Sequence, residues 1–264
     1  MNFYVKKLFP PAPSEREIML GDMEPKLLEK IRAELAVAKR VVFLGGAGVS
    51  VASGIPDFRS PNGLYSQKRA DGMSYEELLS HHYFMQDPKG FYDFYWHGMV
   101  NPSAKPNKAH LALARYEENH NLTILTQNID GLHSLAGSRH VYELHGSVQR
   151  YRCMKCGKAF ALGDLKPEGV PICDRCGGII KPDVVLYEEG LPYDDLEAGI
   201  DAVSKADVMI VGGTSLRVYP FAAIPQYFRG RFSLLINNEA TPLDREFDAV
   251  VHEDIGDTLE AILQ

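Results

Sequence analysis

Six short apolar runs, separated by helical or irregular stretches, are the feature that most constrains the fold of this chain. They cover residues 41–44, 122–125, 141–144, 208–211, 234–236 and 250–251. Continuous runs of Val, Ile and Leu are typical of parallel strands that are buried on both faces. Helical periodicity is found at 25–39, at 196–203 and around 221–228. This alternation predicts an α/β fold with a doubly wound parallel sheet.

Each run is followed by glycine or by polar side chains. The segments are Gly45-Gly46-Ala47-Gly48, Thr126-Gln127-Asn128-Ile129-Asp130, His145-Gly146-Ser147, Gly212-Gly213-Thr214-Ser215, Asn237-Asn238-Glu239 and His252-Glu253-Asp254-Ile255. One such segment alone is more often only a turn. Because ligands of open α/β sheets bind outside the carboxyl ends of the strands, all six together predict one polar cleft for a small molecule.

The first of these segments resembles the beginning of a dinucleotide-binding fingerprint. Glycines at 46 and 48 let the backbone approach a pyrophosphate closely. The match is incomplete, because Val51 stands where the third glycine would be and the ribose-binding acid about 20 residues further on is missing. This departure argues against an ordinary dehydrogenase that transfers hydride.

All four cysteines fall in one short span, as Cys153-x2-Cys156 and, sixteen residues later, Cys173-x2-Cys176. Two CxxC pairs at this spacing predict a structural zinc site. The alternative is a pair of disulfides, which a cytosolic chain disfavours. A catalytic zinc is disfavoured because four thiolates leave no open coordination position.

Composition excludes several other classes of protein. With 45% hydrophobic and 24% charged residues the chain is ordinary and globular, and a net charge of −7 argues against direct nucleic-acid binding. No apolar stretch reaches the roughly 18 residues of a membrane helix, and no secretory h-region follows Lys6 and Lys7. We expect a cytoplasmic, monomeric protein of bacterial type without long regulatory tails.

Several long motifs resemble those of the sirtuins, the NAD-dependent protein deacylases. They are Gly46-Ala47-Gly48-Val49-Ser50, Gly54-Ile55-Pro56-Asp57-Phe58-Arg59-Ser60, Thr126-Gln127-Asn128-Ile129-Asp130, His145-Gly146, both CxxC pairs, Gly213-Thr214-Ser215-Leu216 and Asn237. They follow in the family's order from about residue 25 to the C-terminus. No general requirement of the fold dictates GIPDFRS or TQNID.

The resemblance implies a division into two domains. The NAD-binding Rossmann-like domain would comprise 1–64, 105–147 and 184–264. A helical insert at 65–104 and a zinc-binding module at 148–183 would form the small domain. An acylated-lysine peptide or protein would bind between them as an added strand, contacting Val184, Val185 and Tyr187.

The resemblance also implies the chemistry, in which NAD is consumed. Nicotinamide leaves the ribose, the acyl oxygen of a modified lysine attacks the exposed carbon, and the acyl group ends on ADP-ribose. His145 would be the general base. Asn128 would hold the nicotinamide ribose and Asp130 the nicotinamide amide. The alternatives are a structural histidine and a turn that ends the strand.

The remaining matches are to positions that bind NAD. With those already named, the predicted cofactor-binding residues are Ala47, Gly48, Val51, Asp57, Phe58, Arg59, Gln127, Asn128, Ile129, Asp130, Gly213, Thr214, Ser215, Asn237, Asn238, Asp254 and Ile255. Two departures from the family pattern stand out. Val51 replaces a common threonine, and Tyr187-Glu188-Glu189 replaces a common Phe-Gly-Glu or Phe-Gly-Asp.

The preferred acyl group is predicted from the absence of two residues that bind acidic acyl groups in some sirtuins. Sirtuins that prefer acidic acyl groups carry a Tyr-x-x-Arg pair in the helical insert, and by spacing from His110 its counterparts here are Phe94 and His97. No arginine lies between Arg69 and Arg115. We therefore expect an apolar channel that favours acetyl or longer fatty acyl groups over succinyl.

Three rival functions remain open to the sequence. NAD-dependent protein ADP-ribosylation would use the same pocket. The second rival is a non-catalytic module that senses NAD or binds a partner and retains the fold. The third is a dehydrogenase, which would reduce the cofactor.

Overall fold

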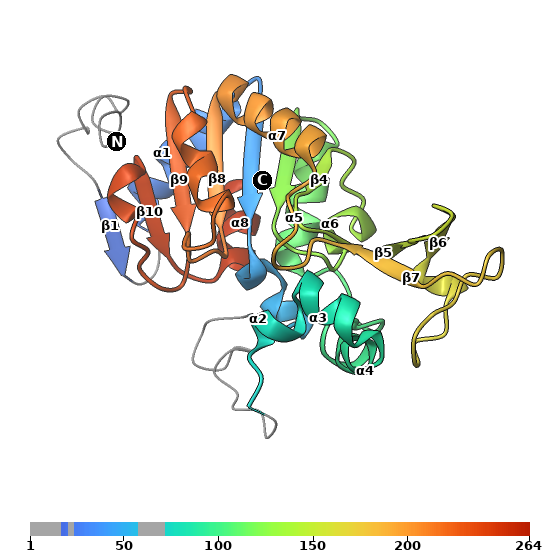
Figure 1. Cartoon of the computed structure of the whole chain (residues 1–264). Coiled ribbons are helices and arrows are strands. Elements are labelled where there is room, and N and C mark those ends of the chain that lie inside the picture. Colours follow the sequence, from blue (N-terminus) through green and yellow to red (C-terminus); the bar gives the residue numbers. More distant parts are fainter. Residues whose placement is uncertain (1–16, 21–23, 58–71) are drawn as a thin grey trace, which may run out of the picture.

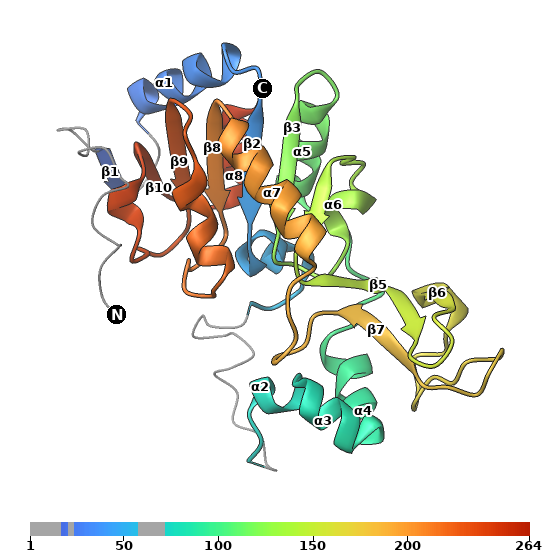
Figure 2. The same cartoon turned by 45° about the horizontal axis from the view of Figure 1, so that its top comes forward.

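The computed structural model describes residues 17–20, 24–57 and 72–264. Figures 1 and 2 show a large part, in which helices cover a parallel sheet, and a smaller part that projects from one side of it. The smaller part consists of short helices and a narrow strand ribbon. No helix in the described ranges is long and apolar enough to cross a membrane.

The large sheet confirms the predicted doubly wound fold. All of its neighbouring strands pair in parallel. Its spatial order is β1 (Glu17–Leu20), β10 (Ala249–His252), β9 (Phe232–Ile236), β8 (Val208–Gly212), β2 (Val41–Gly45), β3 (Leu122–Thr126) and β4 (Val141–Glu143). The six predicted strands, numbered along the chain, follow the Rossmann order 3-2-1-4-5-6. The edge strand β1 was not predicted.

Helices cover both faces of this sheet. Helices α1 (Pro25–Ala36), α5 (Lys108–Glu117) and α8 (Ile255–Ile262) share one core with alternate strand residues, and α7 (Tyr193–Lys205) and the 3₁₀ helix η4 (Phe221–Tyr227) share the other. The strand residues are apolar on both sides, as parallel strands between two helical layers require.

The first helix is shorter than the predicted 25–39. It ends at Ala36, and the carboxylate of Asp207 accepts hydrogen bonds from the N–H groups of Lys39 and Arg40, at 2.7 and 2.9 Å. The two N–H groups thus find an acceptor outside the helix, in the segment that leads from α1 to β2.

The smaller part is built from two separate stretches of the chain. Its helices are α2 (Tyr75–Leu78), α3 (His81–Gln86) and α4 (Pro88–Gly98), and its antiparallel sheet has the order β6 (Ala159–Ala161), β5 (Gly146–Cys153), β7 (Ile180–Val184). A third core joins the two stretches, because aromatic side chains of α3 and α4 pack with Tyr151 and Ile180.

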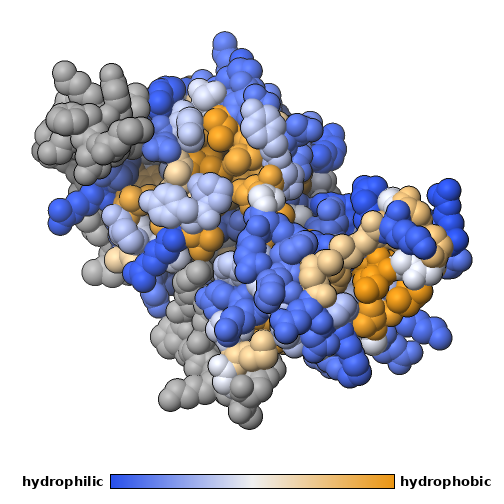
Figure 3. Space-filling view, viewed as in Figure 1, coloured by the Kyte–Doolittle hydropathy of each residue, from blue (hydrophilic) through white to orange (hydrophobic). Residues whose placement is uncertain are grey.

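Figure 3 shows a largely hydrophilic face with two apolar areas, one over the large part and one at the outer end of the ribbon. Met154 and Ile172, which lie beside the cysteines, are about half exposed. The two cysteine pairs therefore have partly exposed apolar side chains beside them.

Candidate active site

The carboxyl ends of the six predicted strands open into one cleft of about 1370 Å³. Residues after β2, β3, β4, β8, β9 and β10 all line it. It lies where the strand order reverses between β2 and β8, which is the position at which open α/β sheets bind their ligands. A cleft larger than the usual 300–1,000 Å³ has room for more than one small molecule.

Two glycine-rich loops meet at this switch point. The N–H of Gly48 donates to the carbonyl of Gly213 at 2.8 Å. A Cβ on Gly48 would lie 2.8 Å from Gly213 Cα, and one on Gly46 would lie 2.7 Å from Thr214 Cβ. Only glycine permits this approach of the two backbones. The result is a backbone-lined floor of the kind that accommodates the pyrophosphate of a dinucleotide.

The structure brings the described candidate residues together on this one cleft. Those that line it are Ala47, Gly48, Val51, Asp57, Gln127, Asn128, Ile129, Asp130, His145, Val184, Val185, Tyr187, Gly213, Thr214, Ser215, Asn237, Asn238, Asp254 and Ile255. Phe58 and Arg59, which the sequence also singled out, lie outside the described residues.

His145 follows β4 and is held in one orientation by the backbone. Its Nδ1 lies 3.1 Å from the carbonyl oxygen of Gln127. Because a carbonyl oxygen only accepts, Nδ1 carries the hydrogen, and Nε2 of the neutral ring keeps its lone pair. Burial lowers the pKa of His145, although the hydrogen bond to Gln127 acts in the opposite direction. The neutral, basic form of the ring is therefore favoured.

Asn128 and Asp130 are linked through Ser50, a motif residue for which the sequence predicted no role. Asn128 Nδ2 donates to the carbonyl of Gly46 at 3.1 Å and to Ser50 Oγ at 3.0 Å. Ser50 Oγ in turn donates to Asp130 Oδ2 at 2.7 Å. The side chains that follow β3 are thereby fixed against the 3₁₀ helix η1 (Ala47–Ser53).

Asn107 is a second residue that the motif analysis missed. It caps α5, and its Nδ2 donates to the carbonyl of Val49 at 2.8 Å and to Ser53 Oγ at 2.9 Å. Its place just before a helical pattern is typical of an N-cap, but nothing in the sequence indicates that the same side chain also anchors η1.

Polar contacts also order the far side of the cleft. Gln127 Nε2 donates to Thr214 Oγ1 at 3.0 Å, which joins the ends of β3 and β8. Asp254 caps α8 by accepting from the N–H of Asp257 at 2.9 Å. Asn237 Nδ2 donates to the carbonyl of Glu239 at 2.6 Å. The side chains at these strand ends are therefore held in place before any ligand binds.

The two residues expected at the acyl channel do not lie on the described part of the cleft wall. Phe94 packs edge-on against Tyr75, with ring centroids 5.6 Å apart, and His97 Nδ1 lies 2.8 Å from the carbonyl of Asp93 in its own helix. Neither is among the described residues that line the cleft, where the end of α4 contributes Gly98 and continues into Met99. Spacing from His110 could not show how α4 is rotated.

The four cysteines lie together as the sequence predicts. Their Sγ atoms lie within 4.8 Å of one another, with Cys153 to Cys176 at 3.4 Å and Cys156 to Cys173 at 3.7 Å. A disulfide needs about 2.05 Å, so these are free thiols. Zn–S bonds of about 2.3 Å place tetrahedral sulfurs about 3.8 Å apart, so the thiol set fits a structural zinc ion.

The parallel sheet in Rossmann order, with its glycine floor at the switch point and an attached four-cysteine module, defines a class of dinucleotide-binding α/β proteins. Comparison with known proteins is more specific. Residues 46–220 match the Sir2 family. The chain belongs to this family, as the sirtuin motifs predicted.

Bacterial relatives are similar to this chain over nearly its whole length. An NAD-dependent protein deacetylase of Clostridium acetobutylicum is 52% identical over 239 residues, which cover 89% of this chain and 96% of that protein. One of Cutibacterium acnes is 52% identical over 223 residues, covering 84% and 91%.

Solved structures agree with the fold. A Sir2 homologue in complex with NAD has a TM-score of 0.79 at 37% identity, covering 92% of this chain and 93% of that one. A structure of Sir2 with a p53 peptide and NAD⁺ has a TM-score of 0.78 at 36% identity, covering 91% and 98%.

Proposed function

We propose that this protein is an NAD-dependent protein lysine deacetylase, which transfers the acyl group from lysine to ADP-ribose with release of nicotinamide. The observation that carries the proposal is the position of His145, a partly buried histidine whose Nδ1 is held by a backbone carbonyl, on the same cleft as the glycine floor and the Asn128–Ser50–Asp130 network. The names of the bacterial relatives support the same activity.

NAD supplies the ADP-ribosyl group that accepts the acyl group. In the proposal, Gly48, Gly213, Thr214 and Ser215 bind its phosphates. Asn128 and Asp130 hold its nicotinamide-ribose end, and Asn237, Asn238, Asp254 and Ile255 its adenosine end. The remaining predicted cofactor positions complete this site, including Phe58 and Arg59.

His145 acts as the general base. Its Nε2 accepts a proton from a ribose hydroxyl, and the Gln127 carbonyl stabilises the positive ring that results, because it accepts from Nδ1. Asn128 is a catalytic residue through its contact with the ribose. Asp130 is fixed by two donors, Ser50 Oγ and the N–H of Leu132, and so presents its carboxylate in one geometry.

The acylated peptide binds along the end of β7 and the segment that follows it, where Val184, Val185 and Tyr187 line the cleft. Among the hydrogen bonds of the described residues, the carbonyl of Val185 and the N–H of Glu188 have no partner. These groups are suited to pairing with an added peptide strand.

We further propose that the cysteine module binds a structural zinc ion. Residues 65–104 and 148–183 then form the small domain, and 1–64, 105–147 and 184–264 the NAD-binding domain. A cytoplasmic location is proposed because the zinc site needs four reduced cysteines, which persist in reducing compartments. The protein is proposed to act as a monomer, and to prefer acetyl over succinyl lysine because the 70–114 stretch contains no arginine.

The test is incubation of purified protein with acetyl-lysine and succinyl-lysine peptides, with and without NAD, followed by mass spectrometry. We expect acetyl loss only with NAD, and faster than succinyl loss. His145→Ala should lower the rate roughly 10²- to 10⁴-fold. ADP-ribose attached to protein without acetyl loss would support the rival transferase. Unchanged turnover in His145→Ala would exclude His145 as the base.

A further inference from the structure

One lip of the cleft, residues 184–190, is fastened to the helical insert by backbone pairing. The N–H of Tyr187 donates to the carbonyl of Leu79 at 2.9 Å, and the N–H of His81 donates to the carbonyl of Tyr187 at 3.0 Å. Ser80 and Tyr187 thus form an isolated parallel bridge. The lip, on which the proposed peptide would pair, is held from behind by the start of α3.

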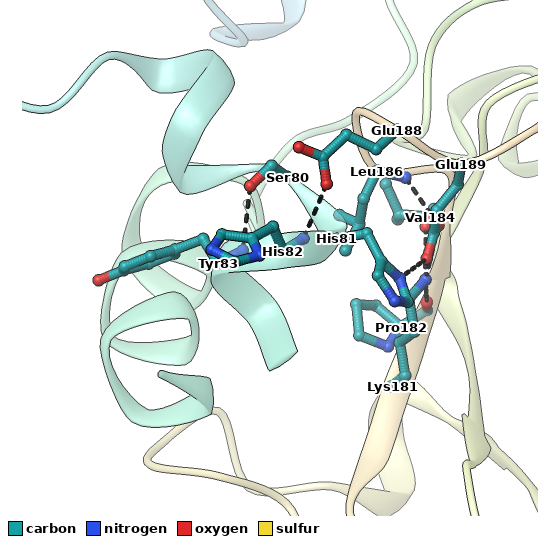
Figure 4. Close-up of polar contacts among 10 residues, drawn as sticks. All are labelled: Ser80, His81, His82, Tyr83, Lys181, Pro182, Val184, Leu186, Glu188 and Glu189. Carbon is teal, nitrogen blue, oxygen red and sulfur yellow. Dashed lines mark hydrogen bonds and ion pairs between the residues drawn. The ribbon is translucent and has the colours of Figure 1, made fainter. Parts of the chain in front are cut away.

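Glu189 connects three separate pieces of structure at this point, as Figure 4 shows. Its Oε1 accepts from His81 Nδ1 at 2.9 Å, and its Oε2 accepts from Lys181 Nζ at 3.1 Å and from the N–H of Leu186 at 2.9 Å. Lys181 Nζ also donates to the carbonyl of Val184 at 2.9 Å. One carboxylate therefore links α3, the beginning of β7 and the turn of the lip itself.

This network is more enclosed than a surface ion pair. The side chains of Lys181 and Glu189 are 18% and 23% exposed, and that of His81 is 45% exposed. Burial alone would raise the pKa of Glu189. The hydrogen bond from Leu186, the contact with His81 and the charge of Lys181 together lower it, so the carboxylate stays ionised.

Glu188 adds a second link from the same lip. It is a non-glycine residue at a φ of 76°, in the left-handed region that most side chains avoid. Its Oε2 accepts from the N–H of His82 in the first turn of α3 at 2.9 Å. This contact holds a strained backbone, and with it the orientation of the adjacent Tyr187, against the insert.

We propose that Glu189 is a positioning residue, which sets the affinity for the acylated peptide by holding the 184–190 lip against α3 through His81 and Lys181. The inference rests on the proposed deacetylase function and deepens it. A strand that is fixed before binding loses less conformational entropy when a peptide pairs with it, so the network acts on peptide binding and not on the NAD chemistry.

The test compares Glu189→Gln, His81→Gln and the double variant with wild type, in steady-state deacetylation of one acetyl-lysine peptide. Glu197→Gln is the matched control, because it removes the same charge from an exposed position of α7 outside the cleft. Glu189→Gln should raise the peptide KM roughly five- to tenfold, with kcat and the NAD KM within about twofold of wild type. The control should change none of them.

The double variant should be no worse than Glu189→Gln alone, because His81 acts through that carboxylate. If Glu189→Gln does not fold, the half-exposed His81→Gln carries the test with a smaller rise in peptide KM. A peptide KM unchanged in the folded variants, or an equal rise in the NAD KM, overturns the inference. A wild-type protein without NAD-dependent deacetylation overturns the proposed function instead, so the two failures are distinguishable.

Discussion

His133 provides a quantitative test of how the core beneath the active site is built. It lies in α6 (Leu132–Leu135), directly after the Asp130 segment, and is only 2% exposed. Its ring packs against His110 at 4.7 Å and Phe43 at 6.0 Å between centroids. Neither of its ring nitrogens has a hydrogen-bond partner among the described residues.

This environment makes the protein less stable in acid. Burial, and to a lesser extent repulsion from His110, lowers the pKa of His133 from 6.5 to about 3. Between these values the unfolded chain binds a proton that the folded chain does not. The contribution of His133 to stability is therefore complete above pH 6.5 and is lost as the pH falls below it. The loss is about 1.4 kcal/mol per pH unit.

The perturbation is His133→Phe, which keeps an aromatic ring in the same contacts and removes the titration. Urea unfolding at pH 7.5 and at pH 5.5 gives the free energy of unfolding of both proteins. The difference between the two pH values should be about 1.4 kcal/mol smaller in His133→Phe than in wild type. A constant packing cost cancels in this comparison. An equal pH dependence of the two proteins would refute the assignment of His133 as a buried neutral ring.

The other predictions concern the site and its supports. Gly146→Ala places a Cβ 1.9 Å from the carbonyl oxygen of Asp183 at a φ of 78°, so its free energy of unfolding should fall by at least ~3 kcal/mol. In the control Gly137→Ala, at a φ of 107°, the Cβ meets nothing within 4 Å, and the free energy of unfolding should fall by only ~1–2 kcal/mol. Equal losses would contradict the clash. Glu188→Ala should be about 1 kcal/mol less stable than Glu188→Gly, because only alanine keeps the left-handed strain; the reverse order in thermal unfolding would count against it. Cys173→Ser should reduce bound zinc well below one ion per chain by elemental analysis, and full occupancy would contradict a four-thiolate site. Because burial lowers the pKa of His145, the acid limb of the kcat/KM profile should lie below pH 6.5, and a limb above that value would exclude this ring as the base.

Sequence reasoning predicted the fold where local pattern and global fold agree. The six apolar runs became parallel strands, because Val-, Ile- and Leu-rich segments can be buried on both faces only in such a sheet. The polar strand ends met at one cleft because parallel strands all end on the same edge. The edge strand β1 was missed, although its sequence contains an apolar run, Ile18-Met19-Leu20, as long as that of residues 234–236.

Local spacing could not show how the side chains are oriented. Phe94 and His97 were placed by distance along the chain from His110, but the rotation of α4 is set by the aromatic packing of Phe91, Tyr92 and Tyr95 in the third core. Ser50 and Glu189 both stand in segments that the sequence singled out, but their hydrogen-bond partners could not be predicted for a similar reason. Their partners lie 80 and 108 residues away, at Asp130 and His81, and only the folded chain brings them together.

The most direct test of the central claim is to count the products of one reaction mixture. Purified protein, NAD and an acetyl-lysine peptide should yield nicotinamide, deacetylated peptide and O-acetyl-ADP-ribose in equal amounts by quantitative mass spectrometry. Reduced cofactor, or nicotinamide release with the peptide still acetylated, would contradict an acyl transfer to ADP-ribose.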